Sequence, residues 1–553
     1  MNENITWRSV SRSFLDEKTA EKIGWKEVFA AWQPVTAGGV RFKENLRPYL
    51  PGNEVDLLHV HELLALDLQR ISPEELRRWR EWLRQLPDIQ PLLASLALDT
   101  LELTPKTALW LKQTVQSTLH LLKESQIPPG LDYLTISDME SLLKPFGHPE
   151  LSHFAVQHLA DSFYLEAQHE EREIKKKLTQ YQTEWLKTLQ KQGWPLYQRP
   201  DSTLMLSLPV HRDLLELVKS TPNLRVLRET PFEIILQRVP DDVESELLVA
   251  WENAFAKLQQ ETDRLLAQLT EQVQRQLQSW NRLADALQEM DIRLSKVALA
   301  RVWQGVVPSV SERWSLREAR HPLLAEQLQQ QGRSFVAIDL PNVGTLNVIT
   351  GSNMGGKSVT LCVIALMQCL LQYGLPVPAV SFTAPLLTGV RLLFAAGTQM
   401  EHGLSAFGQE VVGWGSVLEE AEHQALLLLF DEPGCTTNPQ EGEALVHGLL
   451  HKLSGLQDSI VFLASHYASV AAYQGAAHWR VRGLSSVLHQ DMQNATLAER
   501  LRFLAAAMDY RLERRQPGQG VQEALEVAKW LGLPDSLLQV ARRYQETEGR
   551  MNI

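Results

Sequence analysis

Residues 351–358 read GSNMGGKS and match the pattern GxxxxGKS. An apolar, strand-like segment at 346–350 precedes them, and a segment with helical character at 359–373 follows. Phosphate binding requires this order, because the N–H groups of a glycine-rich turn and of a helix N-terminus then point at the same oxygen atoms. The segment therefore predicts a loop that binds the phosphates of ATP.

The side chains of this loop predict how it binds the nucleotide. Glycines let the backbone curl around the β- and γ-phosphates, Lys357 places a positive charge on them for catalysis, and Ser358 offers its hydroxyl to Mg²⁺. The predicted ATP-binding residues of the loop are Gly351, Ser352, Asn353, Met354, Gly355, Gly356, Lys357 and Ser358.

Two carboxylates follow a second apolar segment. Residues 425–430 form a near-continuous apolar run that suits a buried parallel strand, and Asp431 and Glu432 end it. Carboxylates at the C-terminal end of such a strand can reach the phosphate loop. We therefore predict that Asp431 helps to bind Mg²⁺ and that Glu432 polarises the attacking water as a general base.

A third apolar segment ends in Ser465 and His466. A single histidine is more often structural than catalytic. Its position after the acidic pair, again at the end of an apolar strand, favours a role in sensing the γ-phosphate or in orienting water. His466 is therefore a predicted catalytic residue.

A chain of 553 residues needs more than one domain to position these groups. Helical periodicity broken by prolines predicts a helical core, and two long charged helices flank a small β-rich tip. These helices either space two domains or act as a lever. After residue 308, short strands alternate with helices, which predicts an α/β domain with a mostly parallel sheet. The predicted segments are 1–149 (core), 150–192 (ascending helix), 193–242 (α+β tip), 243–307 (returning helix and core), 308–510 (α/β domain) and 511–553 (C-terminal helices).

The composition limits which partners and which cellular compartment we expect for the protein. The net charge of −12 gives no global positive field that would attract nucleic acid or an anionic membrane, so any contact with DNA needs a local patch. Three cysteines without metal-ligand spacing support neither a disulfide framework nor a zinc site. The first residues lack the pattern of a signal peptide. We expect a cytoplasmic protein that does not associate with membranes.

The phosphate loop resembles that of the MutS family of ATPases, which belongs to the ABC class of phosphate-loop proteins. The family reads GPNMGGKS, and the chain shares Asn353 and Met354 with it. The segment 431–442, DEPGCTTNPQEG, is similar to the family's DEIGRGTSTYDG, and residues 465–467 are similar to its THY. The resemblance implies a fold with a helical core, paired lever helices and a clamp-like tip, followed by the ATPase domain.

Further segments extend the resemblance to a dimer. Residues 404–410, LSAFGQE, resemble the RSTFMVE signature that reaches the nucleotide of the partner subunit, which makes Ser405 a phosphate contact in trans. Phe335 falls where an aromatic residue stacks on adenine. Residues 527–534 resemble VAKLAGLP, part of a helical dimerisation segment. The resemblance thus implies a homodimer, or a heterodimer with a related chain.

Departures from the family pattern leave the ligand open. The chain begins within the core region, so we expect neither the mismatch-reading domain nor the connector. Thr398 and Gln399 replace the usual acidic pair before the signature. The first hypothesis is an ATP-driven clamp on duplex or branched DNA, as in DNA repair. The second is a factor that remodels a protein client, like the MutS-related partners of cobalamin-dependent lysine 5,6-aminomutase. Acidity and the missing mismatch domain favour the second, and family membership favours the first.

Overall fold

The structure is a computed structural model that describes residues 13–199, 203–207, 214–351, 356–394, 405–484, 496, 500, 507–515 and 524–551. Two compact units make up the chain. One contains residues 1–85 and 288–553, and the other contains residues 86–287.

The unit of residues 86–287 is mainly helical. Its helices often begin at a capped residue; Thr104, for example, forms a capping box with Thr107, and Pro105 takes the first helical position. The helices are α6 (Gln90–Ala97), α7 (Pro105–Leu122), α8 (Ile136–Leu143), η1 (Lys144–Phe146), η2 (Val156–Leu159), α9 (Ser162–Lys191), α11 (Leu215–Lys219), α12 (Asp242–Arg275) and the first part of α13 (Leu277–Trp303).

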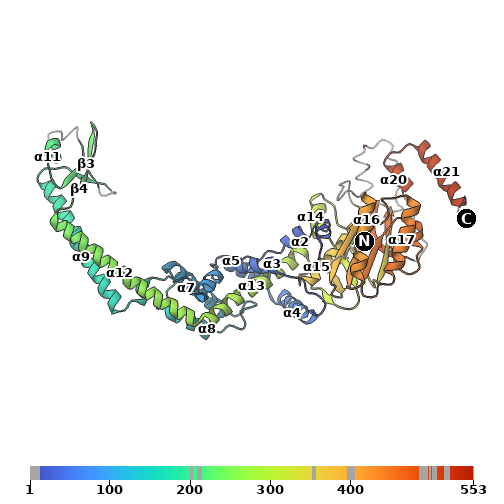
Figure 1. Cartoon of the computed structure of the whole chain (residues 1–553), viewed down its shortest axis with the longest axis horizontal. Helices are drawn as coiled ribbons and strands as arrows, with labels where there is room; N and C mark the ends of the chain where they lie inside the picture. Colours follow the sequence, from blue (N-terminus) through green and yellow to red (C-terminus); the bar gives the residue numbers. More distant parts are fainter. Residues whose placement is uncertain are drawn as a thin grey trace, which may run out of the picture. The chain divides into compact units, whose positions relative to one another are not determined.

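Helices α9 and α12 run side by side (Figure 1). Polar contacts link them along their length: Arg264 pairs with Asp161 at 2.6 Å, and Lys257 pairs with Glu170 at 2.8 Å. The Trp251 indole N–H donates to Glu171 at 2.9 Å. Exposed ion pairs of this kind contribute little stability each.

A small antiparallel sheet follows α9. Its strand order is β1 (Tyr197–Gln198), β2 (Leu204–Ser207), β4 (Glu233–Arg238), β3 (Leu224–Glu229). Alternate residues of these strands face a compact apolar cluster, as the period of two in a half-buried strand requires. The buried members are Trp194, Leu196, Leu204, Leu206, Val218, Leu224, Ile234 and Leu236.

The other unit begins with helices that pack on the second half of α13. Arg293 of α13 forms a two-pronged pair with Asp67 at 2.8 Å, and the Trp32 indole donates to Ser295 at 2.8 Å. The N-terminal helices are α1 (Glu17–Lys22), α2 (Trp25–Ala30), α3 (Ala37–Asn45), α4 (Glu54–Arg70) and α5 (Pro73–Arg84).

A six-stranded sheet forms the centre of this unit. Its order is β10 (Gly389–Phe394), β11 (Leu426–Asp431), β12 (Ile460–Ala464), β8 (Leu346–Thr350), β13 (Ala477–Leu484), β14 (Met508–Arg515). The first five strands are parallel, and only β14 is antiparallel to its neighbour. The expected α/β domain with a mostly parallel sheet, preceded by helical regions, is therefore confirmed. Strand β14 crosses residue 510, where the expected ATPase segment ends.

Helices and a second sheet enclose the six-stranded sheet. The second sheet has the order β5 (Ser309–Val310), β9 (Ser381–Ala384), β6 (Ser315–Ala319), β7 (Ile338–Leu340). Helix α15 (Lys357–Gln372) is buried along nearly its whole length. The other helices are α14 (Pro322–Gln330), α16 (Ala406–Ala421), α17 (Pro439–Leu453), α18 (Ala468–Ala471), α20 (Ala524–Trp530) and α21 (Asp535–Met551). Within the described ranges, no helix combines the length and apolarity needed to cross a membrane.

Candidate functional site

Strand β8 and helix α15 hold the two ends of the predicted phosphate loop. Gly351 and Gly356 both have positive φ angles, +144° and +80°, which favour glycine. A Cβ on Gly356 would lie 3.2 Å from the ring of Tyr510 on β14, so a side chain there is also unfavourable for space. Ser352, Asn353, Met354 and Gly355 lie outside the described residues.

Strand register brings the predicted residues to one edge of the sheet. Asp431 at the end of β11 is the partner of Ala464 on β12, and Ala464 is the partner of Ile349 on β8. Because these strands are parallel, the residues that follow each of them share the C-terminal edge. Residues 356–358, 431–432 and 465–466 therefore meet there, as the sequence predicted.

Lys357 forms the central ion pair of this edge. Its ammonium lies 3.0 Å from Glu432 Oε1 and donates to the Gly351 carbonyl oxygen at 2.9 Å. The Lys357 side chain is only 3% exposed, so the pair is screened from water on the lysine side. Both charges are thus compensated within the chain itself.

Glu432 is held in an uncommon backbone conformation. Its φ angle is +51°, in the left-handed region that residues other than glycine rarely adopt. The Glu432 N–H donates to the Ala464 carbonyl oxygen at 3.0 Å, which ties the turn to strand β12. Such strain costs about 1–3 kcal/mol and persists where the surroundings enforce it, often at functional sites.

Asp431 has the surroundings of a cation ligand. Burial raises the pKa of its carboxyl, and a hydrogen bond from Ser358 opposes that effect. Its Oδ1 atom is buried and has no hydrogen-bond partner among the described residues. An orphaned carboxylate oxygen beside a hydroxyl oxygen suits Mg²⁺, which takes oxygen ligands. The two predicted metal-binding residues thus lie together and fit the ion.

His466 lies at the rim of this group. Its Nδ1 atom is 4.0 Å from Glu432 Oε2, beyond hydrogen-bond distance, and its side chain is 40% exposed. The imidazole packs on the ring of Tyr467, with centroids 4.6 Å apart. The structure therefore places His466 near the acidic pair, with a partly exposed side chain.

Glu410 makes contacts that the sequence analysis did not predict. It accepts hydrogen bonds from the Gly434 N–H at 2.7 Å and from the Thr436 hydroxyl. The Tyr467 hydroxyl donates to the Gly434 carbonyl oxygen at 3.0 Å. The loop after the acidic pair is thus fixed to α16 and to the segment after β12. The signal in the sequence that could have indicated Glu410 is its place in the same segment as Ser405, residues 404–410.

Ser405 and Phe335 make local and core contacts in the structure. Ser405 caps α16, and its hydroxyl accepts a hydrogen bond from the Gly408 N–H at 3.2 Å. The hydroxyl therefore has a structural role within a single chain. Phe335 is partly buried and packs against the main apolar core of this unit. Their expected contacts with nucleotide remain predictions.

The fold and these contacts define a class. A parallel sheet whose C-terminal edge gathers a glycine turn, a buried lysine and an acidic pair is the arrangement of phosphate-loop domains.

Comparisons with known proteins match part of the chain to one family. Residues 347–547 match the model of MutS domain V. The chain is 29% identical over 293 residues to Endonuclease MutS2 of Enterococcus faecalis. This match covers 52% of the chain and 34% of that relative. For Endonuclease MutS2 of Brevibacillus brevis, identity is 29% over 311 residues, with coverages of 54% and 36%. For that of Geobacillus thermodenitrificans, it is 32% over 238 residues, with coverages of 42% and 30%.

The match to MutS domain V and the partial matches to MutS2 support a member of the MutS family, in agreement with the motifs of the loop and of the acidic segment. The matches span about a third of the length of these curated relatives.

Proposed function

We propose that the chain binds ATP at the C-terminal edge of the six-stranded sheet and hydrolyses it with Mg²⁺. The observation that carries this proposal is the convergence of Lys357, Ser358, Asp431 and Glu432 from separate segments of the chain. A buried lysine paired with a strained glutamate is costly to maintain as a purely structural feature.

The ion pair suggests how binding and hydrolysis are linked. The nucleotide phosphates compete with Glu432 for the Lys357 ammonium, which now lies 3.0 Å from that carboxylate. Release of Glu432 would then leave its oxygen atoms available to accept a proton from the attacking water. Ser358 and Asp431 would hold Mg²⁺, which neutralises phosphate charge during transfer. His466 would orient the water or sense the γ-phosphate.

The remaining contacts are proposed from the family resemblance. The glycine loop, with Ser352, Asn353, Met354 and Gly355, would enclose the phosphates, and Phe335 would stack on adenine. Ser405 would contact the nucleotide of a partner subunit. Glu410 fixes the loop after Glu432 to α16, the helix that Ser405 caps. A movement of α16 when a dimer closes would therefore also move the acidic pair.

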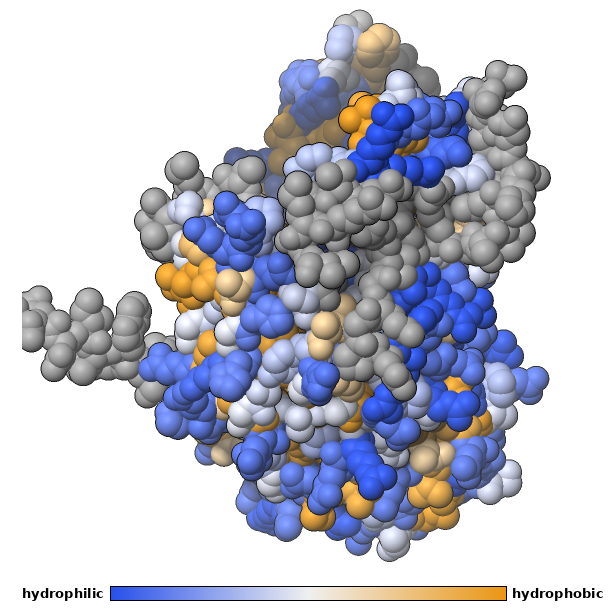
Figure 2. Space-filling model, turned by 90° about the vertical axis from the view of Figure 1, so that its right-hand side faces the viewer, coloured by the Kyte–Doolittle hydropathy of each residue, from blue (hydrophilic) through white to orange (hydrophobic). Residues whose placement is uncertain are grey.

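The C-terminal helices support a dimer. Leu537, Val540 and Tyr544 of α21 are 52%, 65% and 65% exposed. With Leu525 and Ala541 they line an apolar groove of about 540 Å³ between α20 and α21. Figure 2 views the molecule from the right-hand side of Figure 1, where α21 lies, and on this face apolar residues form patches among hydrophilic ones. An apolar stripe on a terminal helix is suited to a second copy or a related chain.

DNA is the proposed ligand of the dimer. The relatives are named endonucleases, which favours DNA over the protein client that we considered as an alternative. Their endonuclease activity is not proposed for this chain, because the matches cover about a third of them. We propose that the segments 150–192 and 243–307 act as levers and that 193–242 acts as the clamp on duplex or branched DNA. Segments 1–149, 308–510 and 511–553 are proposed as core, ATPase and dimerisation segments.

Glu432→Gln tests the chemistry. The variant keeps the shape of the side chain but removes the base, so we expect ATP binding near the wild-type level and turnover at least 100-fold lower. Release of inorganic phosphate measures turnover, and titration of a fluorescent ATP analogue measures binding. A Glu432→Gln chain that hydrolyses ATP at the wild-type rate would remove Glu432 from the mechanism.

A gel-shift series with duplex, mismatched and branched DNA tests the ligand. Binding to phosphates should weaken as salt rises, because counterions are released. No complex at low salt with a non-hydrolysable ATP analogue present would refute DNA as the ligand.

A further inference from the structure

The segment of residues 13–22 covers the outer edge of strand β10. The Val390 N–H donates to the Phe14 carbonyl oxygen at 2.8 Å, and the Leu392 N–H donates to the Thr19 hydroxyl at 2.9 Å. These two N–H groups point away from β11. On an uncovered edge strand they would bond to water, and here the segment supplies their acceptors. It thereby becomes part of the sheet that carries the nucleotide site.

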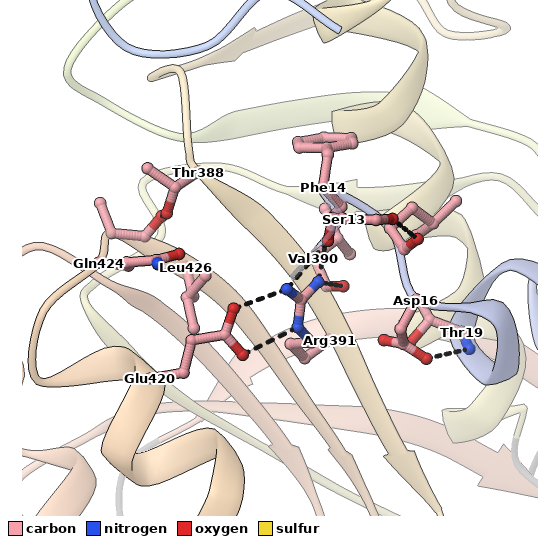
Figure 3. A network of polar contacts seen from close by, with 12 residues as sticks. Ser13, Phe14, Asp16, Thr19, Thr388, Val390, Arg391, Glu420, Gln424 and Leu426 are labelled. Carbon is pink, nitrogen blue, oxygen red and sulfur yellow. Dashed lines mark hydrogen bonds and ion pairs between the residues drawn. The ribbon is translucent and has the colours of Figure 1, made fainter. Parts of the chain in front are cut away.

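Arg391 fastens this segment in place. Its guanidinium donates to the carbonyl oxygens of Ser13 and Phe14, each at 3.0 Å, and pairs with Glu420 of α16 at 2.6 and 3.1 Å (Figure 3). Both side chains of the ion pair are buried. Charge-assisted bonds of this kind fix geometry strongly. The N-terminal segment and α16 therefore have a fixed position on β10.

The segment brings Lys22 to the edge that carries the site. The Lys22 ammonium lies 4.8 Å from the centre of the Phe394 ring, and Phe394 is the register partner of Asp431. The Cys362 thiol, four residues after Ser358 on α15, contacts the Lys22 carbonyl oxygen at 3.7 Å. The charge of Lys22 also acts on Asp431. Lys22 is exposed and forms no ion pair with any residue in the described part of the chain.

We propose that Lys22 is a further phosphate-binding residue, which draws a bound nucleoside triphosphate toward the β10 side of the site. This inference rests on the proposed function. An exposed cation–π contact is weak, so the ammonium can leave Phe394 for a polyanion. Lys357, by contrast, must first leave Glu432. The triphosphate carries more negative charge than the diphosphate and gains more from Lys22.

Titration of fluorescent ATP and ADP analogues tests this proposal. Lys22→Ala should raise the Kd of the triphosphate about five-fold, which corresponds to about 1 kcal/mol, and raise that of the diphosphate less. Lys22→Arg keeps the charge and should stay within about two-fold of the wild type. Lys26→Ala, which removes an exposed lysine from the neighbouring helix α2, should change neither Kd.

The possible outcomes separate the two proposals. If the wild type binds no nucleotide, the proposed function and this inference both fail. If the wild type binds and Lys22→Ala has unchanged affinities, only this inference fails. Equal weakening of triphosphate and diphosphate, without recovery in Lys22→Arg, would indicate a structural role and would also overturn it.

Thr19→Val tests whether the segment delivers the lysine. The substitution removes the acceptor of the Leu392 N–H and nearly keeps the side-chain volume. We expect Thr19→Val to raise the Kd of the triphosphate. In the double variant with Lys22→Ala, the increase in Kd should be smaller than the two single effects combined. Full additivity of the two effects would show that the segment does not position Lys22.

Discussion

Lys296 carries a buried charge that the fold does not compensate, and its removal should stabilise the protein. The residue lies on α13 and is 6% exposed. Its ammonium is 5.8 Å from the centre of the Trp32 ring, and no described residue forms an ion pair or hydrogen bond with it. Burial lowers the pKa of Lys296 from 10.5 to about 8. The charged form is therefore disfavoured in the folded state.

The size of the effect follows from linkage. Each pKa unit corresponds to about 1.4 kcal/mol, so this shift corresponds to a cost of about 3 kcal/mol. Because the pKa is lowered on folding, the cost is absent above pH 10.5, grows as pH falls toward 8, and is full at pH 7. Lys296→Met keeps an unbranched apolar chain without the charge. We expect it to raise the free energy of unfolding by about 1–3 kcal/mol at pH 7.

Chemical denaturation at pH 7 and at pH 10.5 measures the difference. Hydrogen exchange of peptides from 288–303 at pH 7 shows whether the gain lies in this unit, since the chain has two compact units. Lys26→Met, at an exposed lysine, is the control and should change stability by less than about 0.5 kcal/mol. A Lys296→Met variant that is no more stable at pH 7, or that gains equally at both pH values, would refute the reasoning.

Three other predictions follow from the same unit. His61 is buried, and neither ring nitrogen has a hydrogen-bond partner among the described residues; burial together with Lys296 lowers its pKa to about 4. Stability should therefore fall as pH drops from 6.5 to 4, and His61→Leu should reduce this dependence in pH-dependent denaturation. Glu410→Ala should lower ATP turnover more than ten-fold with a smaller effect on nucleotide binding, because the Gly434 N–H loses its acceptor; phosphate release and analogue titration measure the two effects. Val540→Glu should shift the proposed dimer to monomer in sedimentation, and a dimer that is unchanged by the substitution would exclude the apolar residues of α21 as its contact.

The sequence was sufficient to predict that the residues of the candidate site meet at one edge of a parallel sheet. Apolar runs that end in Thr350, Asp431 and Ala464 indicated three parallel strands, and the polar residues after them meet because parallel strands end together. Local pattern and short-range chemistry carry this information. The ion pair of Lys357 with Glu432 and the hydrogen bond of Ser358 with Asp431 were not predicted and come from the structure.

Contacts between distant segments could not be predicted in the same way. Residues 13–22 show no strand-like pattern, and their place on β10 depends on Arg391 and Glu420, far along the chain. Nothing within either local sequence specifies the other. The unpaired Lys296 also escaped prediction, because its surroundings come from several helices and its burial is a property of the assembled core. Tyr510 against Gly356 is a third example.

The N-terminal segment also has a consequence for the behaviour of the chain in solution. Strand β10 is an outer strand of the six-stranded sheet, and the backbone of Phe14 and the side chain of Thr19 occupy its outward N–H groups. Without residues 13–19, the apolar strand Gly389–Phe394 would present free donors to any other extended chain. Truncated forms that begin after Thr19 should therefore self-associate through this edge, and a fusion or cleavage site placed within the segment would carry the same risk.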